Sequence, residues 1–135
     1  MDARAARDVI PWCAEHGAAF IPFAPLGRGF LTGRLTSAGF EDGDFRARNP
    51  RFAEEAMAAN QAIVDRVRAV AERHDAAPGQ VALAWVLAQG EHIVPIPGTK
   101  RIAYLEENAA AAELQLTADD LAELETAPNP VGTRY

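Results

Sequence analysis

The chain has 135 residues, and 49% of them are hydrophobic, so it is long enough and apolar enough to form the core of one domain. The formal net charge of −6 argues against a general binder of nucleic acid or anionic membranes, because the basic residues do not gather into one stripe. No apolar run is long enough to span a bilayer, and the first residues lack a signal-peptide apolar region, so we expect a cytoplasmic protein.

The first segment predicts a helix followed by a short strand. Apolar side chains at helical spacing predict a helix over Ala3–His16, and Gly17 is a typical residue for its end. The single cysteine, Cys13, excludes an internal disulfide and a multi-cysteine metal site, and we expect a small buried side chain there. Ala18–Phe23 is an apolar run typical of a strand covered on both faces. Pro22 removes one ladder donor, so we expect it near the strand's end or at an unpaired position.

A glycine-rich loop follows this strand. The segment Ala24–Gly33 holds three glycines in seven residues, and the carboxyl end of a strand is where α/β proteins bind ligands. Two interpretations fit the pattern: a loop that folds over a bound cofactor, or a flexible connection. The continuation, Leu35–Arg51, includes Gly39 and is rich in arginine, and it predicts a long surface loop.

Two helices are predicted next. The first is amphipathic and runs over Phe52–His74, with His74 favourably placed for the helix dipole. Its predicted apolar face consists of Met57, Ile63, Val64, Val67 and Val70. The second begins with Pro78 at its first position and is apolar almost all round, so we expect it to be deeply buried, with Trp85 in the core and Gly90 at its end.

A second strand, turn and helix follow. Ile93–Ile96 predicts a short buried strand, Pro97-Gly98 breaks it, and Thr99 is expected to open a helix. A helix N-terminus has unpaired N–H groups and a partial positive charge, so Thr99, Lys100 and Arg101 could hold a phosphate there. The alternative is an ordinary connection with solvated basic residues. The turn by itself does not decide between the two.

The C-terminal segment predicts one more helix. Thr117 and Asp120 form a near capping box, and the apolar face of the helix consists of Leu116, Leu121 and Leu124. Beyond Pro128, we expect residues 131–135 to fray. The alternation of helices with two strands predicts an α/β fold with parallel strands. Two strands cannot close a barrel, and a complete β/α barrel needs about 250 residues, so the chain is expected to be part of something larger.

Three motifs, taken together, resemble the C-terminal half of an aldo-keto reductase. They are FIPFAPLGRGFLTG at residues 20–33, NPRF at residues 49–52, and IVPIPGTKR at residues 93–101 followed by LEEN at residues 105–108. The resemblance spans nearly the whole chain. It implies an α/β fold, namely a partial (β/α)₈ TIM barrel of roughly the last two β/α units with a preceding helix and a C-terminal helix. Residues 1–135 would then be one incomplete domain.

The resemblance also implies a cofactor, NADPH, and a role for each matching residue. Phe23 stands where the family has an aromatic residue that stacks on the nicotinamide ring. Pro25, Leu26, Gly27 and Arg28 match the loop along the pyrophosphate. The turn that holds the 2′-phosphate is matched by Gly98, Thr99, Lys100 and Arg101, and the pair near the adenine by Glu107 and Asn108.

The family's Tyr proton donor and its assisting Lys, Asp and His have no counterpart in this sequence. Tyr104 and Tyr135 lie in other contexts, and Lys100 is the only lysine. The chain is therefore expected to be the NADPH-binding C-terminal portion of an NADPH-dependent aldehyde or ketone oxidoreductase, inactive alone. It would meet a carbonyl substrate only when an N-terminal half completes it. The alternatives are a non-catalytic nucleotide-binding or regulatory module, and a half-barrel that assembles with itself or a partner through its open edges.

Overall fold

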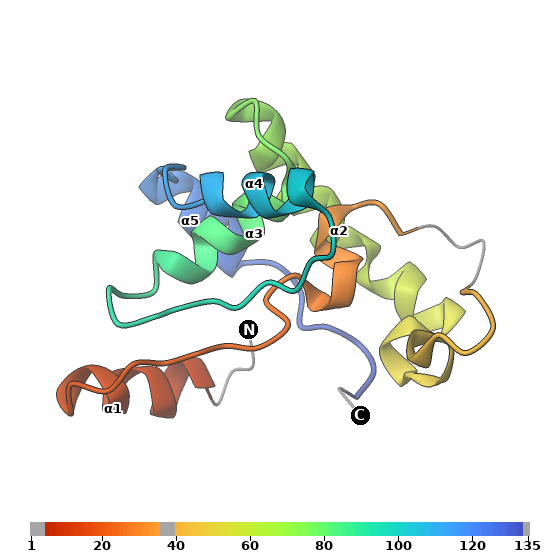
Figure 1. The fold of residues 1–135 in the computed structure, drawn as a ribbon, viewed down its shortest axis with the longest axis horizontal. Coiled ribbons are helices and arrows are strands. Elements are labelled where there is room, and N and C mark those ends of the chain that lie inside the picture. The colour runs from red at the N-terminus through yellow and green to blue at the C-terminus, as the bar shows by residue number, and fades with distance from the viewer. Residues whose placement is uncertain (1–4, 36–39, 134–135) are drawn as a thin grey trace.

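The computed structural model describes residues 5–35 and 40–133. Ala3, Gly39 and Tyr135, which appear in the predictions above, lie outside these ranges. A π-helical turn η1 (Ala5–Val9) leads into α1 (Ile10–Glu15), so the first predicted helix is confirmed over its described part (Figure 1). The remaining elements are η2 (Gly27–Thr32), η3 (Phe45–Arg48), η4 (Pro50–Phe52), α2 (Glu54–Arg73), α3 (Pro78–Leu87), α4 (Ile102–Ala110) and α5 (Ala118–Glu125).

The two predicted strands lie side by side, but they do not form a continuous ladder. Two isolated parallel bridges join Phe20 to Ile93 and Phe23 to Ile96, in the same register. The Phe20 N–H donates to the His92 carbonyl at 2.8 Å, and the Val94 N–H donates to the Phe20 carbonyl at 2.9 Å. Figure 1 shows the two extended segments, in orange-red and teal, running next to each other.

Pro22 explains the interruption. In a parallel pair, every second residue of one segment donates to and accepts from the other. The register of the two bridges gives Pro22 that position, and its carbonyl does accept from the Ile96 N–H at 3.5 Å. It has no N–H to donate to Val94, so both bridges between the observed two are lost. Pro22 thus lies next to the end of the segment, as expected, but its missing N–H faces the Val94 carbonyl and not an unpaired position.

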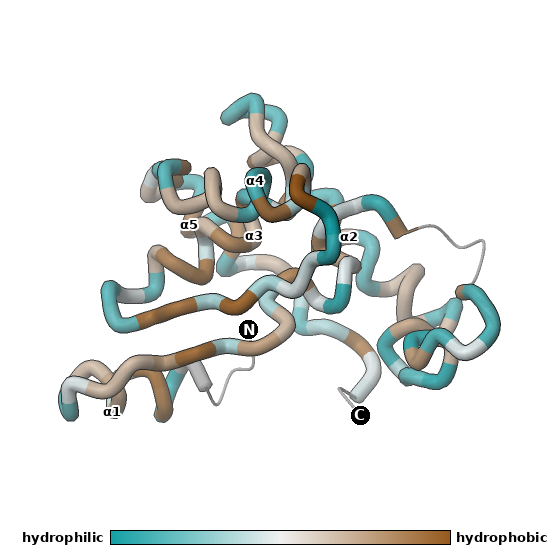
Figure 2. The backbone as a smooth tube through the Cα atoms, viewed as in Figure 1, coloured by the Kyte–Doolittle hydropathy of each residue, from teal (hydrophilic) through white to brown (hydrophobic). Residues whose placement is uncertain are grey.

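The two faces of this pair have different surroundings. Phe20 and the buried Ile93 pack with Ile10 of α1 and Val86 of α3. On the other face, the side chains of Ile21, Phe23, Val94 and Ile96 are 57%, 47%, 51% and 52% exposed. Figure 2 shows apolar colour along both segments. One face is therefore covered by helices, and the other is an uncovered apolar surface.

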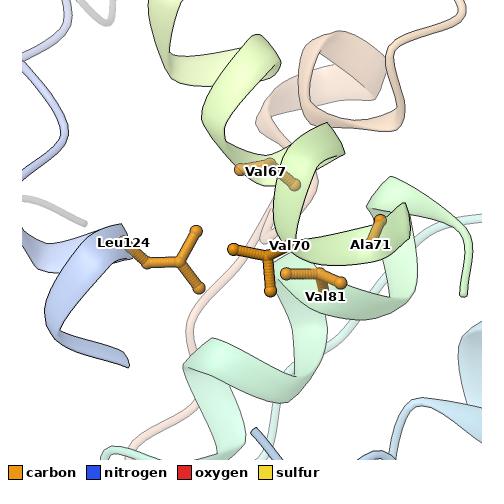
Figure 3. Packing of buried hydrophobic residues seen from close by; sticks show 5 residues of the cluster. All are labelled: Val67, Val70, Ala71, Val81 and Leu124. Atoms are coloured by element: carbon orange, nitrogen blue, oxygen red, sulfur yellow. The ribbon is translucent and has the colours of Figure 1, made fainter. Parts of the chain in front are cut away.

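The main core lies between the helices. Val67, Val70 and Ala71 of α2 pack with Val81 of α3 and Leu124 of α5 (Figure 3). Trp85 is only partly buried and contacts both this cluster and the one beneath the extended pair. The burial of Val64, Val67 and Val70 and the deep burial of α3 confirm the periodicity argument in part, because Met57 and Ile63 are only partly buried. Pro78 begins α3 as predicted, and the helix ends at Leu87, before Gly90.

The C-terminal segment is more ordered than predicted. Thr117 caps α5, and Thr117 and Asp120 form the expected capping box. Farther on, the backbone of Val131 is hydrogen-bonded to Asn60, and the Gly132 carbonyl accepts from Arg51. The prediction that the chain frays from Val131 is therefore wrong for residues 131–133. In the described part of the chain, no helix has the length and apolarity needed to cross a membrane.

Candidate functional site

The two loops that follow the extended segments leave from the same edge. Because the segments are parallel and their last bridge joins Phe23 to Ile96, their carboxyl ends are adjacent. Pro25 and Gly98 each come two residues after that bridge. Figure 1 shows both segments turning away at the same end of the pair. We call the loop over residues 24–33 the first junction and the turn over residues 97–101 the second junction.

The first junction is a compact, irregular turn. Ala24, Gly27, Arg28 and Gly29 all have positive φ angles, and the Leu26 carbonyl accepts from the N–H groups of Gly29 and Leu31. For Arg28, a φ of +58° is a costly backbone state outside glycine. The segment thus forms an irregular turn in which Arg28 and Gly29 interrupt the helical backbone of η2.

Two residues of the long loop hold Arg28 in place. The Arg28 carbonyl accepts from Arg46 Nη1 at 3.3 Å, and its guanidinium lies 5.1 Å from the centre of the Phe45 ring. Arg46 is itself fixed by Asp44, with Nη2 to Oδ2 at 2.6 Å and Nε to Oδ1 at 3.1 Å. Sequence reasoning missed both residues, because an arginine-rich loop does not show which arginine turns inward.

The second junction differs from the prediction. α4 begins at Ile102 with Arg101 as its N-cap, so the expectation that Thr99 opens the helix is wrong. The Thr99 hydroxyl accepts from the Arg101 N–H at 3.2 Å, forming a local turn that competes with helical hydrogen bonding. Lys100 and Arg101 are exposed. The turn therefore leaves two cations in solvent beside the first turn of α4.

Glu107 is brought toward the first junction. A methyl group placed on Gly79, in the first turn of α3, would lie 3.7 Å from atoms of Leu26 and Glu107. The Glu107 carboxylate accepts from Arg34 Nη2 at 2.7 Å, and this hydrogen bond is the main reason why the pKa of Arg34 is raised. The structure thus places Leu26 and Glu107 at one location. The next residue, Asn108, is half-buried.

Arg34 is a third residue that the sequence analysis missed. Its guanidinium lies 4.6 Å from the centre of the Tyr104 ring, and the guanidinium of Arg101 lies 5.5 Å from the same ring. One aromatic ring therefore contacts the cation that follows the first junction and a cation of the second junction. The sequence feature that could have indicated Arg34 is its position directly after Gly33, at the end of the glycine-rich loop. Among the described residues, no group of three His, Cys, Asp or Glu side chains could hold a metal ion.

A separate polar cluster lies between α2 and α5. An open hollow of about 390 Å³ is lined by Arg73, His74, Thr117, Asp119, Asp120 and Glu123. Asp120 accepts hydrogen bonds there from Thr117, His74 and Arg73. The sequence predicted only an interaction of His74 with the helix dipole. The structure adds a hydrogen bond between His74 and Asp120. These contacts join one helix to another, so the cluster acts as an anchor for α5.

Comparisons with known proteins identify the relatives of this chain. The family model described as "Aldo/keto reductase family" matches residues 1–128. "Aldo-keto reductase yakc [NADP(+)]" of Schizosaccharomyces pombe is 42% identical over 131 residues, covering 94% of this chain and 38% of that protein. "Aldo-keto reductase str7" of Strobilurus tenacellus is 45% identical over 109 residues, covering 80% of this chain and 32% of that protein.

A solved structure shows the same fold. The glycerol dehydrogenase of Gluconobacter oxydans matches with a TM-score of 0.80 and 23% identity, over 97% of this chain and 42% of that one. The arrangement of helices around a parallel pair is therefore that of part of a larger fold, and the chain spans 32% to 38% of the length of the two curated relatives above. With a family model covering nearly the whole sequence, the chain belongs to the aldo/keto reductase family.

Proposed function

We propose that this chain is the NADPH-binding C-terminal portion of an NADPH-dependent aldehyde or ketone oxidoreductase. The observation that carries the proposal is the parallel register of Phe23 and Ile96, because it puts both junctions at one edge. Ligands of parallel α/β sheets bind at the carboxyl ends of the strands. The name of the Schizosaccharomyces pombe relative, which includes NADP(+), supports the choice of cofactor.

Each junction would hold a different part of the dinucleotide. Phe23 is 47% exposed on the uncovered face, so its ring is accessible for stacking on the nicotinamide. Pro25, Leu26, Gly27 and Arg28 lie in the compact turn that would follow the pyrophosphate.

At the second junction, a methyl group added to Gly98 would have no other atom within 4 Å, so a ligand can approach the backbone there closely. Beside it, Thr99, Lys100 and Arg101 precede the first turn of α4, whose free N–H groups favour an anion. A 2′-phosphate fits this combination of two cations and a helix N-terminus. Glu107 and Asn108 would lie near the adenine.

The residues of this chain would bind and orient, and they would not transfer the proton. The cofactor supplies hydride when bound. A carbonyl oxygen that gains negative charge needs a proton donor and hydrogen-bond donors aimed at it. The family's Tyr donor and its assisting residues would come from an N-terminal half, so we expect the isolated chain to bind NADPH without reducing carbonyl compounds.

The test is a titration of the purified chain with NADPH and with NADH. We expect the double variant Lys100→Ala/Arg101→Ala to lose about 10- to 100-fold in affinity for NADPH, the amount expected when one or two charge-assisted contacts are lost. NADH, which has no 2′-phosphate, should lose much less. The control Arg7→Ala/Arg48→Ala makes the same change in net charge at two other exposed arginines and should bind like the parent.

Equal losses for both cofactors would contradict the 2′-phosphate assignment. No binding of NADPH by the parent chain would contradict the proposal that these residues suffice to hold it. Turnover of an aldehyde by the parent would contradict the assignment of the proton donor to another part of the protein. If a longer protein containing this chain binds NADPH and also lacks reductase activity, the non-catalytic nucleotide-binding module is the better description.

A second candidate, a half-barrel that pairs with itself or with a partner chain, is favoured by one specific observation. Four apolar side chains on the uncovered face of the extended pair are each about half exposed, as described above. An apolar surface of this kind is usually covered in a working protein. Because Phe23 belongs to this face, self-association would bury the ring proposed to stack on the nicotinamide, so self-association and cofactor binding need separate measurements.

A further inference from the structure

Residues 131–133 are held against the protein by a side chain from the middle of the sequence. Asn60 of α2 is 3% exposed, and its amide makes two hydrogen bonds to one residue, Val131. Its Nδ2 donates to the Val131 carbonyl at 3.0 Å, and its Oδ1 accepts from the Val131 N–H at 2.7 Å. The two residues are 71 positions apart. The side-chain amide of Asn60 thus pairs with the tail backbone as a neighbouring strand would.

The next residue packs directly on the loop that precedes α2. Arg51 Nε donates to the Gly132 carbonyl at 3.2 Å. A methyl group added to Gly132 would lie 2.8 Å from the Pro50 carbonyl oxygen and 3.0 Å from the Arg51 backbone nitrogen, and the φ angle there is +89°. Only glycine fits such a position without displacing backbone. The tail and η4 therefore pack closely, backbone against backbone.

From η4 the contacts continue to the first junction. The Arg51 N–H donates to Asn49 Oδ1 at 3.0 Å, which fixes the turn that positions Phe52. The buried ring of Phe52 lies edge-on to Phe30 of η2, with ring centres 6.4 Å apart. Figure 1 shows the blue C-terminal segment crossing to the side of the molecule where η4 and the start of α2 lie. The tail is therefore linked to the turn that contains Arg28 through one continuous set of contacts.

We propose that residues 131–133 form a strap that positions the first junction for its cofactor, and that Asn60 is the positioning residue that holds the strap. The cofactor part of this inference rests on the function proposed above. A buried Asn in the interior of a helix is unfavourable unless both polar atoms find partners. Here both partners belong to the tail, so the polar group serves this attachment and not the packing of α2.

The test compares three variants by hydrogen exchange and by NADPH affinity. Asn60→Ala removes the two hydrogen bonds from α2 to Val131. Gly132→Ala disrupts the packing of the tail against η4. A chain that ends at Pro130 lacks the strap and leaves the sequence of α2 unchanged. Circular dichroism establishes that each variant is folded at the temperature used. The control is Gly17→Ala, which also places alanine at a positive φ, +63°, but with nothing within 4 Å of the added methyl group.

We expect amide exchange in residues 26–33 and 44–52 to become about tenfold faster in all three variants, the change expected for the loss of about one net hydrogen bond. Exchange in α3 should stay as in the parent. The dissociation constant for NADPH should rise by about three- to tenfold, which corresponds to a partial loss of preorganisation. Gly17→Ala should change neither quantity.

Faster exchange confined to residues 131–133 would overturn the strap. Faster exchange in residues 26–33 with an unchanged NADPH affinity would overturn its role in cofactor binding. If the parent chain does not bind NADPH at all, the proposed function fails, while the exchange data alone still decide whether the tail positions the first junction.

Discussion

Asp120 is the side chain with the most interactions in the anchor of α5. It is 4% exposed, and its two carboxylate oxygens accept from Thr117, His74 and Arg73, with the shortest contacts at 2.7 Å. Burial raises the pKa of this carboxyl, but the hydrogen bonds from these three residues lower the pKa by a larger amount. The net pKa therefore lies well below the ordinary value. Hydrogen bonds from these donors favour the charged form of the carboxylate.

The direction of this shift fixes the pH dependence of stability. Since the folded pKa of Asp120 is depressed, its contribution is complete above the unfolded pKa, about 3.9, and is lost as pH falls toward the folded pKa. We expect Asp120→Asn to lower the free energy of unfolding by about 1–3 kcal/mol at pH 7. The difference between parent and variant should shrink below about pH 4.

Urea denaturation from pH 2 to pH 7 measures this difference. Asp119→Asn is the matched control, because Asp119 is the neighbouring acid in the same helical turn and is exposed. The control should follow the parent curve closely. A difference between parent and Asp120→Asn that stays constant over the whole range would mean that Asp120 stabilises the protein by shape and not by charge.

At the scale of the element, one proline decides the form of the extended pair. The segment Ala18–Phe23 has the apolar composition of a strand and lies in strand register, yet only Phe20 and Phe23 form bridges. Pro22 removes the donor on which both intermediate bridges depend. The ladder is thus limited by one missing N–H and not by a shift in register.

Replacing Pro22 should restore the ladder. In Pro22→Val, we expect the new N–H of residue 22 to donate to the Val94 carbonyl and to be protected from exchange by about tenfold or more relative to an unstructured amide. The stability should change by less than about 1 kcal/mol, because the gained hydrogen bond is offset by a more flexible unfolded chain. Nuclear magnetic resonance reads the exchange of this amide, with the Val94 amide as an internal reference. Unprotected exchange at residue 22 would contradict the parallel register of the pair.

At the scale of the whole molecule, the uncovered face of the extended pair is an exposed apolar surface. Ile21 lies across from Val94 and Phe23 across from Ile96, so four apolar side chains form one surface. α4 carries another exposed apolar pair, Ile102 and Leu105, at 77% and 58% exposure. The chain spans 38% of the Schizosaccharomyces pombe relative, and both surfaces are exposed in this structure.

We expect the purified chain to self-associate through the face of the extended pair. The variant Ile21→Glu/Val94→Lys puts an opposite-charge pair on neighbouring segments, which the pairing tolerates, and it should reduce association by about tenfold or more. Sedimentation velocity over a range of concentrations measures this. The control, Ile102→Lys/Leu105→Glu, removes a similar amount of apolar surface from α4. Equal effects of the two variants would place the contact elsewhere or show that it is unspecific.

The sequence by itself determined the local structure and the family. Periodicity located α2 and α3, Pro78 marked a helix start, and Thr117 with Asp120 marked the last cap, because these signals depend on residues within one or two helical turns. The motifs around Gly27 and Gly98 pointed to the aldo/keto reductase family, which the family match confirms.

Only the tertiary structure decided the long-range contacts. The pairing of Arg34 with Glu107, of His74 with Asp120 and of Asn60 with Val131 joins positions that no local pattern relates. The same is true of the effect of Pro22, since a missing donor matters only when the register places an acceptor opposite it. Local preferences set each element, whereas partners far apart in the chain become neighbours only when the helices and the extended pair have packed.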